Sequence, residues 1–299
     1  MTIVISVVVC TYNRANLLSG CLESLAKQSA DIPGYEVIII DNNSTDKTKE
    51  VADSFIRKYP NFRYLKEPIT GKSYACNRGY REARGEYAAY IDDDARADGR
   101  WVENIIAFAS KHPDVVAFGG PYTRFSLEEL PEWYKETTYG TKTLGEKQRP
   151  IDKNEWISGT NMVFKKTLLS GLGGFDTRLG PMGNTFSYGE ETNLLVKIKK
   201  KNLPIFYVPD MVVEHLVADY KMSLKWMLMS HYKNGFSAME AFELRRRPFR
   251  QALVTLYCLL NGFIRFIFSK KRYFRARVLE SFSVFVWNLG LTVRVFKRE

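Results

Sequence analysis

The chain has 299 residues, and its 44 Lys and Arg residues against 33 Asp and Glu residues give a formal net charge of +11 at pH 7. Residues 245–299 hold 13 of the basic residues and two of the acidic ones, so residues 1–244 are neutral overall. This distribution argues against a surface that coats nucleic acid and indicates a basic tail that contacts something anionic.

Strand and helix patterns alternate through the first 120 residues. Apolar, β-branched runs predict buried strands at residues 3–10, 35–40, 62–65, 86–91 and 115–119. Apolar residues at helical spacing follow the first four of them, at 17–25, 45–58, 71–84 and 99–111. Strands separated by helices of this length predict right-handed βαβ units and an α/β fold with a mostly parallel sheet.

Polar residues follow the carboxyl ends of four predicted strands, where ligands bind in such sheets. These segments are residues 11–14, 41–46, 71–73 and 92–94. Asp41 at the end of the second strand can accept hydrogen bonds from a ribose or a base edge, or it can serve only as a turn residue. Four adjacent polar strand ends favour a ligand site at this edge.

Asp92, Asp93 and Asp94 directly follow a buried strand and form the sharpest local feature of this edge. Three adjacent carboxylates repel one another, and Mg²⁺ or Mn²⁺ relieves that repulsion by taking oxygen ligands. Because side chains alternate along an extended chain, we expect Asp92 and Asp94 to converge while Asp93 points elsewhere. The alternative is a solvated turn that leads into the next helix.

Several common patterns are missing from the sequence. No G-x-G-x-x-G follows the first strand and no G-x-x-x-x-G-K-[ST] occurs, which excludes a dinucleotide-type turn and a P-loop NTPase. Four single cysteines without a C-x-x-C pair argue against a zinc module or a disulfide framework and favour a reducing compartment. The N-terminal apolar run at 3–10 is too short for a signal peptide and has no basic start.

An ordered set of segments resembles the family 2 glycosyltransferases. The segments are ISVVVCTYNR (5–14), VIIIDNNSTD (37–46), GKSYACNRG (71–79), GEYAAYIDDDA (85–95), GTNM (159–162), GGFD (173–176), GEE (189–191) and VEH (213–215). Each segment alone is unspecific, but their order and spacing over residues 3–218 are specific. The resemblance implies a GT-A fold and transfer of a sugar, with inversion, from a nucleotide-sugar donor.

By this resemblance, side chains at the strand ends bind the donor nucleotide and a metal ion. The nucleotide-binding residues implied are Thr11, Tyr12, Asn13, Arg14, Asp41, Asn43, Lys72, Asp92 and Asp93. Tyr12 would flank the base, and Asp41 would bond to a base N–H group. Asp94 and Asp92 would bind Mn²⁺ or Mg²⁺ together with His215, for which a purely structural role is the alternative.

The catalytic base of the family lies in a Glu-Asp pair that opens a helix, and here that place reads Glu190-Glu191. The second position departs from the usual Asp by one methylene group. We expect Glu191 to be the general base and Glu190 to orient the acceptor hydroxyl or bond to the backbone. The alternative is that both acids only favour a helix N-terminus.

The acceptor side is expected to lie in residues 121–220. Trp156, Gly159 and Asn161 are assigned to it, together with the irregular segment 122–155, whose aromatic residues include Trp133, Tyr134 and Tyr139. Residues 178–187, which contain Gly180, Pro181 and Gly183, are expected to form a mobile loop over the site.

The tail combines a helix at 222–244 with two uncharged apolar stretches at 251–264 and 281–293. Both stretches are shorter than the roughly 20 residues needed to cross a bilayer as a helix. A basic, aromatic segment at 270–277 joins them. This pattern predicts attachment to an anionic membrane surface through residues 245–299, and the alternative is a helical hairpin that packs on the catalytic domain or in a dimer.

The sequence therefore predicts a metal-assisted glycosyltransferase with a GT-A domain at 1–220 and a helical, basic extension at 221–299. Residues 1–120 would bind the donor, and residues 121–220 would hold the acceptor and the base. The expected partners are a nucleotide-sugar, a glycan or lipid-linked acceptor, and the cytoplasmic face of the cell membrane, with no nucleic acid. A sugar-nucleotide nucleotidyltransferase and an inactive nucleotide-sugar-binding relative are the alternatives.

Overall fold

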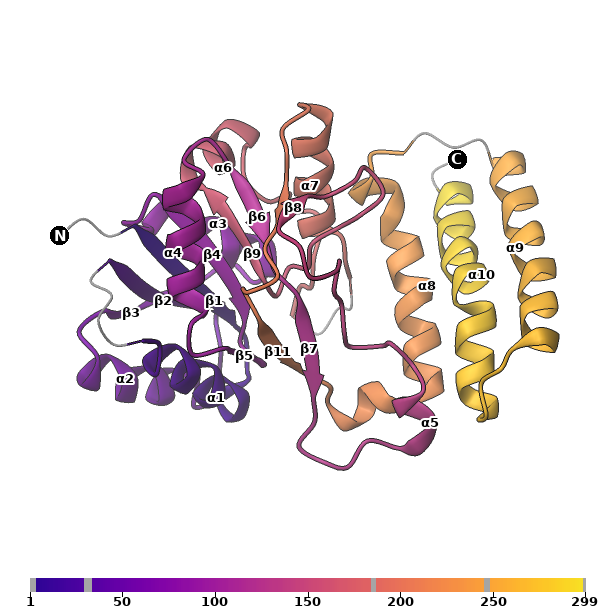
Figure 1. Cartoon of the computed structure of the whole chain (residues 1–299), viewed down its shortest axis with the longest axis horizontal. Coiled ribbons are helices and arrows are strands. Elements are labelled where there is room, and N and C mark those ends of the chain that lie inside the picture. The colour runs from indigo at the N-terminus through magenta and orange to yellow at the C-terminus, as the bar shows by residue number, and fades with distance from the viewer. Residues whose placement is uncertain (1–3, 30–33, 184–186, 245–247, 298–299) are drawn as a thin grey trace.

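An eight-stranded sheet forms the centre of the computed structural model, which describes residues 4–29, 34–183, 187–244 and 248–297 (Figure 1). The strand order is β3-β2-β1-β4-β9-β6-β10-β8. The strands are β1 (Ile5–Thr11), β2 (Tyr35–Asp41), β3 (Phe62–Lys66), β4 (Tyr87–Asp92), β6 (Ala117–Gly119), β8 (Arg149–Pro150), β9 (Met162–Lys165) and β10 (Phe206–Tyr207).

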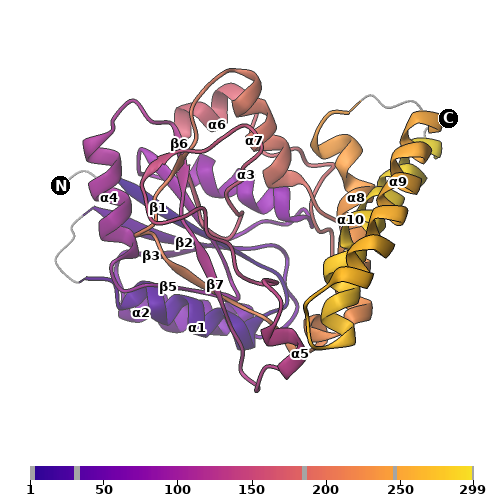
Figure 2. The same ribbon diagram turned by 45° about the vertical axis from the view of Figure 1, so that its right-hand side comes forward.

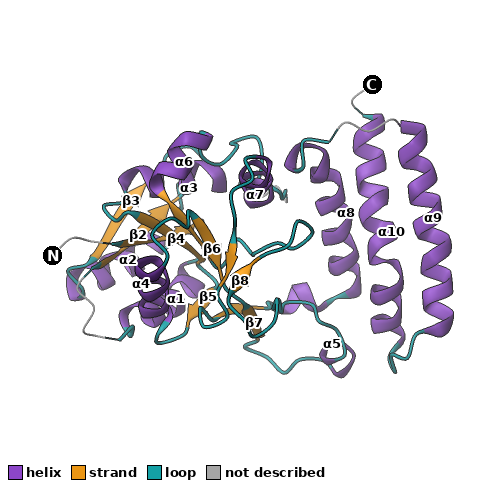
Figure 3. Cartoon of the chain, turned by 45° about the horizontal axis from the view of Figure 1, so that its top comes forward, coloured by secondary structure: helices purple, strands orange, loops and turns teal. Residues whose placement is uncertain are grey.

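Helices cover both faces of this sheet, because side chains alternate along each buried strand. Val7 and Val9 of β1 pack into one apolar cluster, and Val8 packs into the other. The first cluster includes α1 (Ala15–Ala26), α2 (Thr48–Lys58) and α4 (Trp101–Lys111); the second includes α3 (Lys72–Glu82), α6 (Lys166–Leu172) and α7 (Glu190–Lys200). Figure 3 shows the sheet between these two layers.

A second, three-stranded sheet has the order β5-β11-β7. Its strands are β5 (Ala95–Ala97), β7 (Tyr122–Phe125) and β11 (Val213–Leu216). β11 pairs antiparallel with β5 and places His215 opposite Ala95, the residue after Asp94. The backbone N–H of Leu216 donates to the carbonyl of Asp94 at 2.9 Å. This sheet therefore carries His215 to the end of β4.

The expected fold class is confirmed, with differences in the second part of the sheet. β1 pairs in parallel with β2 and β4, but β9 pairs antiparallel with both β4 and β6. The sequence pattern did not predict β9 at this place, because a short inserted strand has no periodicity that links it to a neighbour. A short helix α5 (Glu132–Lys135) and a 3₁₀ turn η1 (Asp219–Met222) complete this part.

Three long helices lie beside the α/β unit as a separate layer (Figures 1 and 2). They are α8 (Leu224–Ala241), α9 (Pro248–Phe268) and α10 (Phe274–Phe296). α10 packs between α8 and α9, and the backbones of α8 and α10 approach closely at Gly235 and Gly290. A Cβ atom at Gly235 would overlap the carbonyl of Trp287, and one at Gly290 would overlap the carbonyl of Tyr232.

Helices α9 and α10 are longer than their uncharged stretches, because each continues past an arginine, Arg265 in α9 and Arg294 in α10. α9 has 21 residues and α10 has 23, so by length and composition alone both are long and apolar enough to cross a membrane. This differs from the expectation that both stretches are too short. Arg245, Arg246 and Arg247, the start of the basic tail, lie outside the described residues, as does part of the expected loop at 178–187.

Candidate active site

The carboxyl ends of β1, β2 and β4 meet at one edge of the large sheet. Parallel pairing places Cys10 level with Asp92 and Thr11 level with Asp41. The chain leaves these strands directly into the polar segments 11–14, 41–46 and 92–94. Short polar segments that are separate in the sequence therefore form a single cluster of side chains at this edge.

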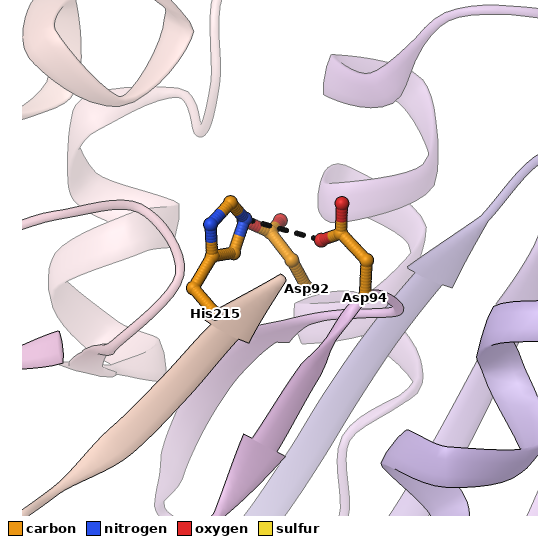
Figure 4. Close-up of side chains that lie close together, drawn as sticks. All are labelled: Asp92, Asp94 and His215. Atoms are coloured by element: carbon orange, nitrogen blue, oxygen red, sulfur yellow. Dashed lines mark ion pairs between the residues drawn. The ribbon is translucent and has the colours of Figure 1, made fainter. Parts of the chain in front are cut away.

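Asp92, Asp94 and His215 form a group whose potential ligand atoms all lie within 4.8 Å of one another (Figure 4). The Nε2 atom of His215 lies 3.1 Å from Oδ1 of Asp94 and 3.8 Å from Oδ2 of Asp92. Two carboxylates and an imidazole suit a divalent cation such as Mn²⁺, which accepts both oxygen and nitrogen ligands. The donor set therefore fits a metal site.

Cations surround Asp94, which is almost fully buried. Burial alone would raise the pKa of Asp94, but the hydrogen bond from His215 and the charges of Lys221 and Arg14 hold it well below its usual range. Lys221 Nζ lies 3.4 Å from Oδ2 of Asp94. The site is therefore arranged to keep this carboxylate ionised, as a metal ligand requires.

Asp93 is not part of this ligand group and pairs with Arg14. The Nη1 atom of Arg14 lies 2.9 Å from Oδ1 of Asp93 and 3.2 Å from Oδ2 of Asp94. Burial raises the pKa of Asp93 to about 6, although the charge of Arg14 opposes this. Arg14 thus braces two adjacent carboxylates at the start of α1.

Lys72 connects the aspartates with the two glutamates that open α7. Its Nζ atom lies 3.1 Å from Oδ1 of Asp92, 2.8 Å from Oε1 of Glu191 and 3.5 Å from Oε1 of Glu190. Burial would lower the pKa of Lys72, but these three carboxylates raise it well above its usual value. Gly71, with φ 144°, lets the chain turn so that Lys72 begins α3 at this point.

Glu190 and Glu191 begin α7 after Gly189, whose φ is 107°. The side chain of Glu190 is 3% exposed and that of Glu191 is 24% exposed. Burial, and then the charge of Glu191, raise the pKa of Glu190 to about 8. At neutral pH Glu190 is therefore mostly protonated and can donate a hydrogen bond, whereas Glu191 lies beside the Lys72 ammonium group.

One cavity of about 810 Å³ contains these groups. The expected site residues on its wall are Thr11, Tyr12, Asn13, Arg14, Lys72, Asp92, Asp93, Asp94, Gly159, Glu190, Glu191 and His215. The buried hydroxyl of Thr160, also on this wall, has no hydrogen-bond partner among the described residues. The volume and the mixed polar wall suit a small-molecule ligand.

Four expected site residues do not lie on the described wall of this cavity: Asp41, Asn43, Trp156 and Asn161. Asp41 accepts hydrogen bonds from the Tyr64 hydroxyl and the Ser44 N–H group, each at 2.7 Å. Asn43 has a φ of 68° and serves the turn after β2.

Trp156 and Asn161 make internal contacts instead. The Trp156 ring packs edge-on against Phe242, with the Lys199 ammonium group 3.6 Å from its centroid. Asn161 is fully buried, accepts a hydrogen bond from Trp101 Nε1 at 2.9 Å and donates to two backbone carbonyls. These bonds connect the residue before β9 to α4 and to the segments that precede β7 and β11.

The cavity also has wall residues that sequence reasoning did not single out. They include Tyr122, Tyr188, Tyr220, Lys221, Trp226, Ser230 and Asn234, with Tyr139 from the expected irregular segment. Trp226, Ser230 and Asn234 belong to α8, which the sequence assigned to the extension. Their spacing of four residues was a usable signal for one helix face, but nothing in the sequence says that this face meets the active site.

The chain is similar to known proteins in its sequence and in its fold. The family model described as Glycosyl transferase family 2 matches residues 6–173. The chain is 27% identical over 241 residues to the glucosyl-dolichyl phosphate glucuronosyltransferase of Haloferax volcanii, which covers 78% of this chain and 75% of that protein. It is 22% identical over 262 residues to glycosyltransferase AglE of the same organism, covering 87% of this chain and 81% of the relative.

A similar solved structure is that of the mannosyltransferase PcManGT from Pyrobaculum calidifontis in complex with GDP-Man and Mn²⁺. It superposes with a TM-score of 0.66 at 18% identity and covers 100% of this chain and 88% of its own. At this identity the likeness establishes the fold.

Proposed function

The chain belongs to glycosyl transferase family 2, and we propose that it transfers a sugar, with inversion, from a nucleoside-diphosphate-sugar to a hydroxyl group of a glycan or lipid-linked acceptor. Membership makes it a glycosyltransferase with a GT-A fold, which sets the nucleotidyltransferase alternative aside. The observation that carries the proposal is one cavity that holds the Asp92, Asp94 and His215 group and the Glu190-Glu191 pair, with Lys72 between them.

The donor nucleotide is proposed to bind along the wall formed by residues 11–14 and Lys72. Arg14 and Lys72 bring positive charge to the edge of the carboxylate cluster, where a diphosphate would lie. Asp41 and Asn43 are proposed to hold the neighbouring loop, since Asp41 already bonds to Tyr64 and Ser44. The nucleoside would then lie between this loop and Tyr12.

A divalent metal, Mn²⁺ or Mg²⁺, is proposed to be held by Asp92, Asp94 and His215. Their ligand atoms are already close together, and the cations around Asp94 keep that carboxylate ionised. When bound, the ion supplies positive charge that offsets the charge of the diphosphate leaving group.

Glu191 is proposed as the general base. It takes the proton of the acceptor hydroxyl while the acceptor oxygen forms a bond to the anomeric carbon. The bond between that carbon and the diphosphate oxygen breaks, and its electron pair leaves with the nucleoside diphosphate. Glu190, protonated at neutral pH, is proposed to donate a hydrogen bond that orients the acceptor.

The C-terminal helices are proposed to attach the enzyme to the cytoplasmic face of a membrane. α9 presents a stripe in which each residue is more than half exposed: Leu253, Leu256, Leu260, Phe263 and Ile267. The connection to α10 adds Lys270, Lys271 and Arg272, which suit anionic headgroups. A lipid-linked acceptor would be presented there, and the name of the Haloferax relative includes a glucosyl-dolichyl phosphate.

A thermal-shift screen of nucleoside diphosphates and nucleotide-sugars, with and without Mn²⁺, tests this function. A ligand that binds the folded chain raises its melting temperature by mass action. We expect one base to stabilise the chain more than the others, and only with the metal present. If no nucleotide shifted the melting temperature in either condition, the proposed function would be rejected.

A further inference from the structure

One part of the cavity wall is aromatic and uncharged, and the proposed chemistry gives it no role. It is formed by Tyr139, Tyr188, Tyr220, Trp226, Ser230 and Asn234. Lys221 lies nearby on the same wall, but its ammonium group is paired with Asp94. The wall formed by these six residues is therefore uncharged, and three of them belong to α8.

The α8 part of this wall is a stripe with a spacing of four residues. Trp226, Ser230 and Asn234 lie one turn apart on one helix face. Figure 1 shows α8 between the α/β unit and α10. The stripe lines the cavity, while Tyr232 and Gly235 of α8 approach the backbone of α10. The stripe presents an indole, a hydroxyl and an amide in sequence.

Two tyrosines hold the indole of Trp226 in place. The rings of Tyr139 and Tyr220 meet it edge-on, with centroids at 6.1 Å and 5.9 Å and interplanar angles of 88° and 74°. Edge-to-face packing of this kind fixes ring orientation and is favourable in itself. The cavity thus has a braced aromatic surface.

Hydroxyl groups lie directly beside the indole. The buried Ser230 Oγ is 2.8 Å from the Tyr188 hydroxyl and 3.4 Å from the Tyr139 hydroxyl. A flat apolar surface next to neutral donors and acceptors matches a sugar ring, which has an apolar C–H face and a rim of hydroxyl groups. It matches a phosphate or a carboxylate poorly, because none of the six wall residues carries a positive charge and the nearby Lys221 is paired with Asp94.

The C-terminal end of α8, the helix that carries the stripe, also contacts α7, the helix that carries the proposed base. Tyr188 and Gly189 precede Glu190, and a Cβ atom at Gly189 would come within 2.7 Å of Cβ of Ala241 at the end of α8. Asn193 of α7 donates to the backbone carbonyl of Ala241 at 3.4 Å. The start of α7 and the C-terminal end of α8 are therefore in direct contact.

We propose that this wall is the binding site for a neutral acceptor sugar, whose apolar face stacks on Trp226 and whose hydroxyl groups bond to Ser230 and Asn234. The inference rests on the proposed function and names the acceptor class for the same site. It places the reacting hydroxyl toward Glu191 and leaves the aglycone outside the cavity, next to the C-terminal helices.

Titration calorimetry of the full chain with octyl β-D-glucopyranoside and octyl β-D-mannopyranoside, in the presence of Mn²⁺ and saturating UDP or GDP, tests the site. The wild-type chain should bind at least one glycoside, and Trp226→Ala should raise its Kd roughly tenfold or more, while Trp226→Phe retains most of the affinity. Trp287→Ala, the same substitution on α10 and outside the described cavity wall, should leave the Kd unchanged. Octyl phosphate, which has the same octyl group but no sugar ring, should not compete with the glycosides.

The proposal is overturned if neither glycoside binds, if Trp226→Ala binds as tightly as wild type, or if octyl phosphate competes. Nucleotide binding is measured in the same samples before the glycoside is added. Failure of nucleotide binding would reject the proposed function, whereas intact nucleotide binding without glycoside binding would reject only the acceptor site.

Discussion

The carboxylate of Glu191 occupies the space beside the Cα atom of Gly159, so that a methyl group on Gly159 would overlap it. Gly159 lies in the segment before β9, and Glu191 lies at the start of α7, 32 positions further along the sequence. No side chain other than hydrogen leaves room for Glu191 in its observed position beside Lys72. This contact explains why glycine is needed here.

Gly159→Ala should therefore displace Glu191 and reduce the transfer rate by roughly a hundredfold, because small misplacements of a reacting group are costly. Nucleotide binding should persist, since the displaced group is not on the nucleotide wall. Steady-state kinetics measure the transfer rate, and titration calorimetry measures nucleotide binding. Gly171→Ala is the matched control, because a Cβ atom there meets nothing within 4 Å; equal rates in both variants would contradict the role of this contact.

Glu190 should make the folded chain less stable as the pH rises. The pKa of Glu190 is about 8 in the fold against its ordinary value of 4.5, so between these pH values the folded state holds a proton that the unfolded state has released. The contribution of Glu190 to the free energy of unfolding is therefore fully present below pH 4.5. It falls as the pH rises from 4.5 to about 8, by at most about 1.4 kcal/mol per pH unit.

Glu190→Gln should flatten this dependence and be more stable than wild type at about pH 8. Urea unfolding of both chains at several pH values measures it. Glu128→Gln, on an exposed carboxylate, should keep the wild-type slope. A Glu190→Gln slope identical to that of wild type would show that Glu190 ionises normally in the fold.

Asp94→Asn should weaken Mn²⁺ binding at least about tenfold, because an amide is a poorer ligand than a carboxylate. Calorimetric titration of Mn²⁺ into the chain with UDP or GDP present is the measurement. Asp93→Asn serves as the comparison, since its carboxylate faces Arg14 and is not in the ligand group. Unchanged Mn²⁺ affinity in Asp94→Asn would remove this residue from the metal site.

The connection between α9 and α10 should bind anionic lipid. Changing Lys270, Lys271 and Arg272 to Glu should abolish co-sedimentation with phosphatidylglycerol vesicles and leave transfer to a soluble acceptor intact, because charge attracts the segment to the headgroups. Changing Lys47, Lys49 and Lys58, near or within α2, to Glu provides an equal charge change elsewhere. If the first variant still bound vesicles but lost a dimer in light scattering, the dimer alternative would replace the membrane one.

Much of the donor half could be predicted from the sequence, because the evidence was local. Buried β-branched strands and their polar ends follow from short runs, and side-chain alternation predicted that Asp92 and Asp94 would converge, which agrees with a ligand group that contains both and not Asp93. In the structure, Asp93 forms an ion pair with Arg14. Lys72 was expected near the nucleotide, but its contact with Glu191 joins residues 119 positions apart and has no local signal.

The acceptor side was harder to predict because it depends on tertiary contacts. Asn161 looked like a site residue, yet its amide satisfies buried backbone groups, and one sequence cannot separate these roles. Trp226 looked like part of a peripheral helix, and its place on the cavity wall beside Tyr139 and Tyr220 depends on tertiary contacts. The long helices α9 and α10 were underestimated because charged residues near their ends were counted as boundaries.

The most direct test of the central claim is the single-turnover transfer rate of Glu191→Gln, measured with saturating donor and Mn²⁺ beside the Kd for the nucleoside diphosphate. Glutamine keeps the shape of the side chain but accepts a proton poorly, so a transfer rate at least roughly a hundredfold lower with an unchanged Kd is the predicted result. A rate equal to that of wild type would contradict the assignment of Glu191 as the base and, with it, the proposed mechanism.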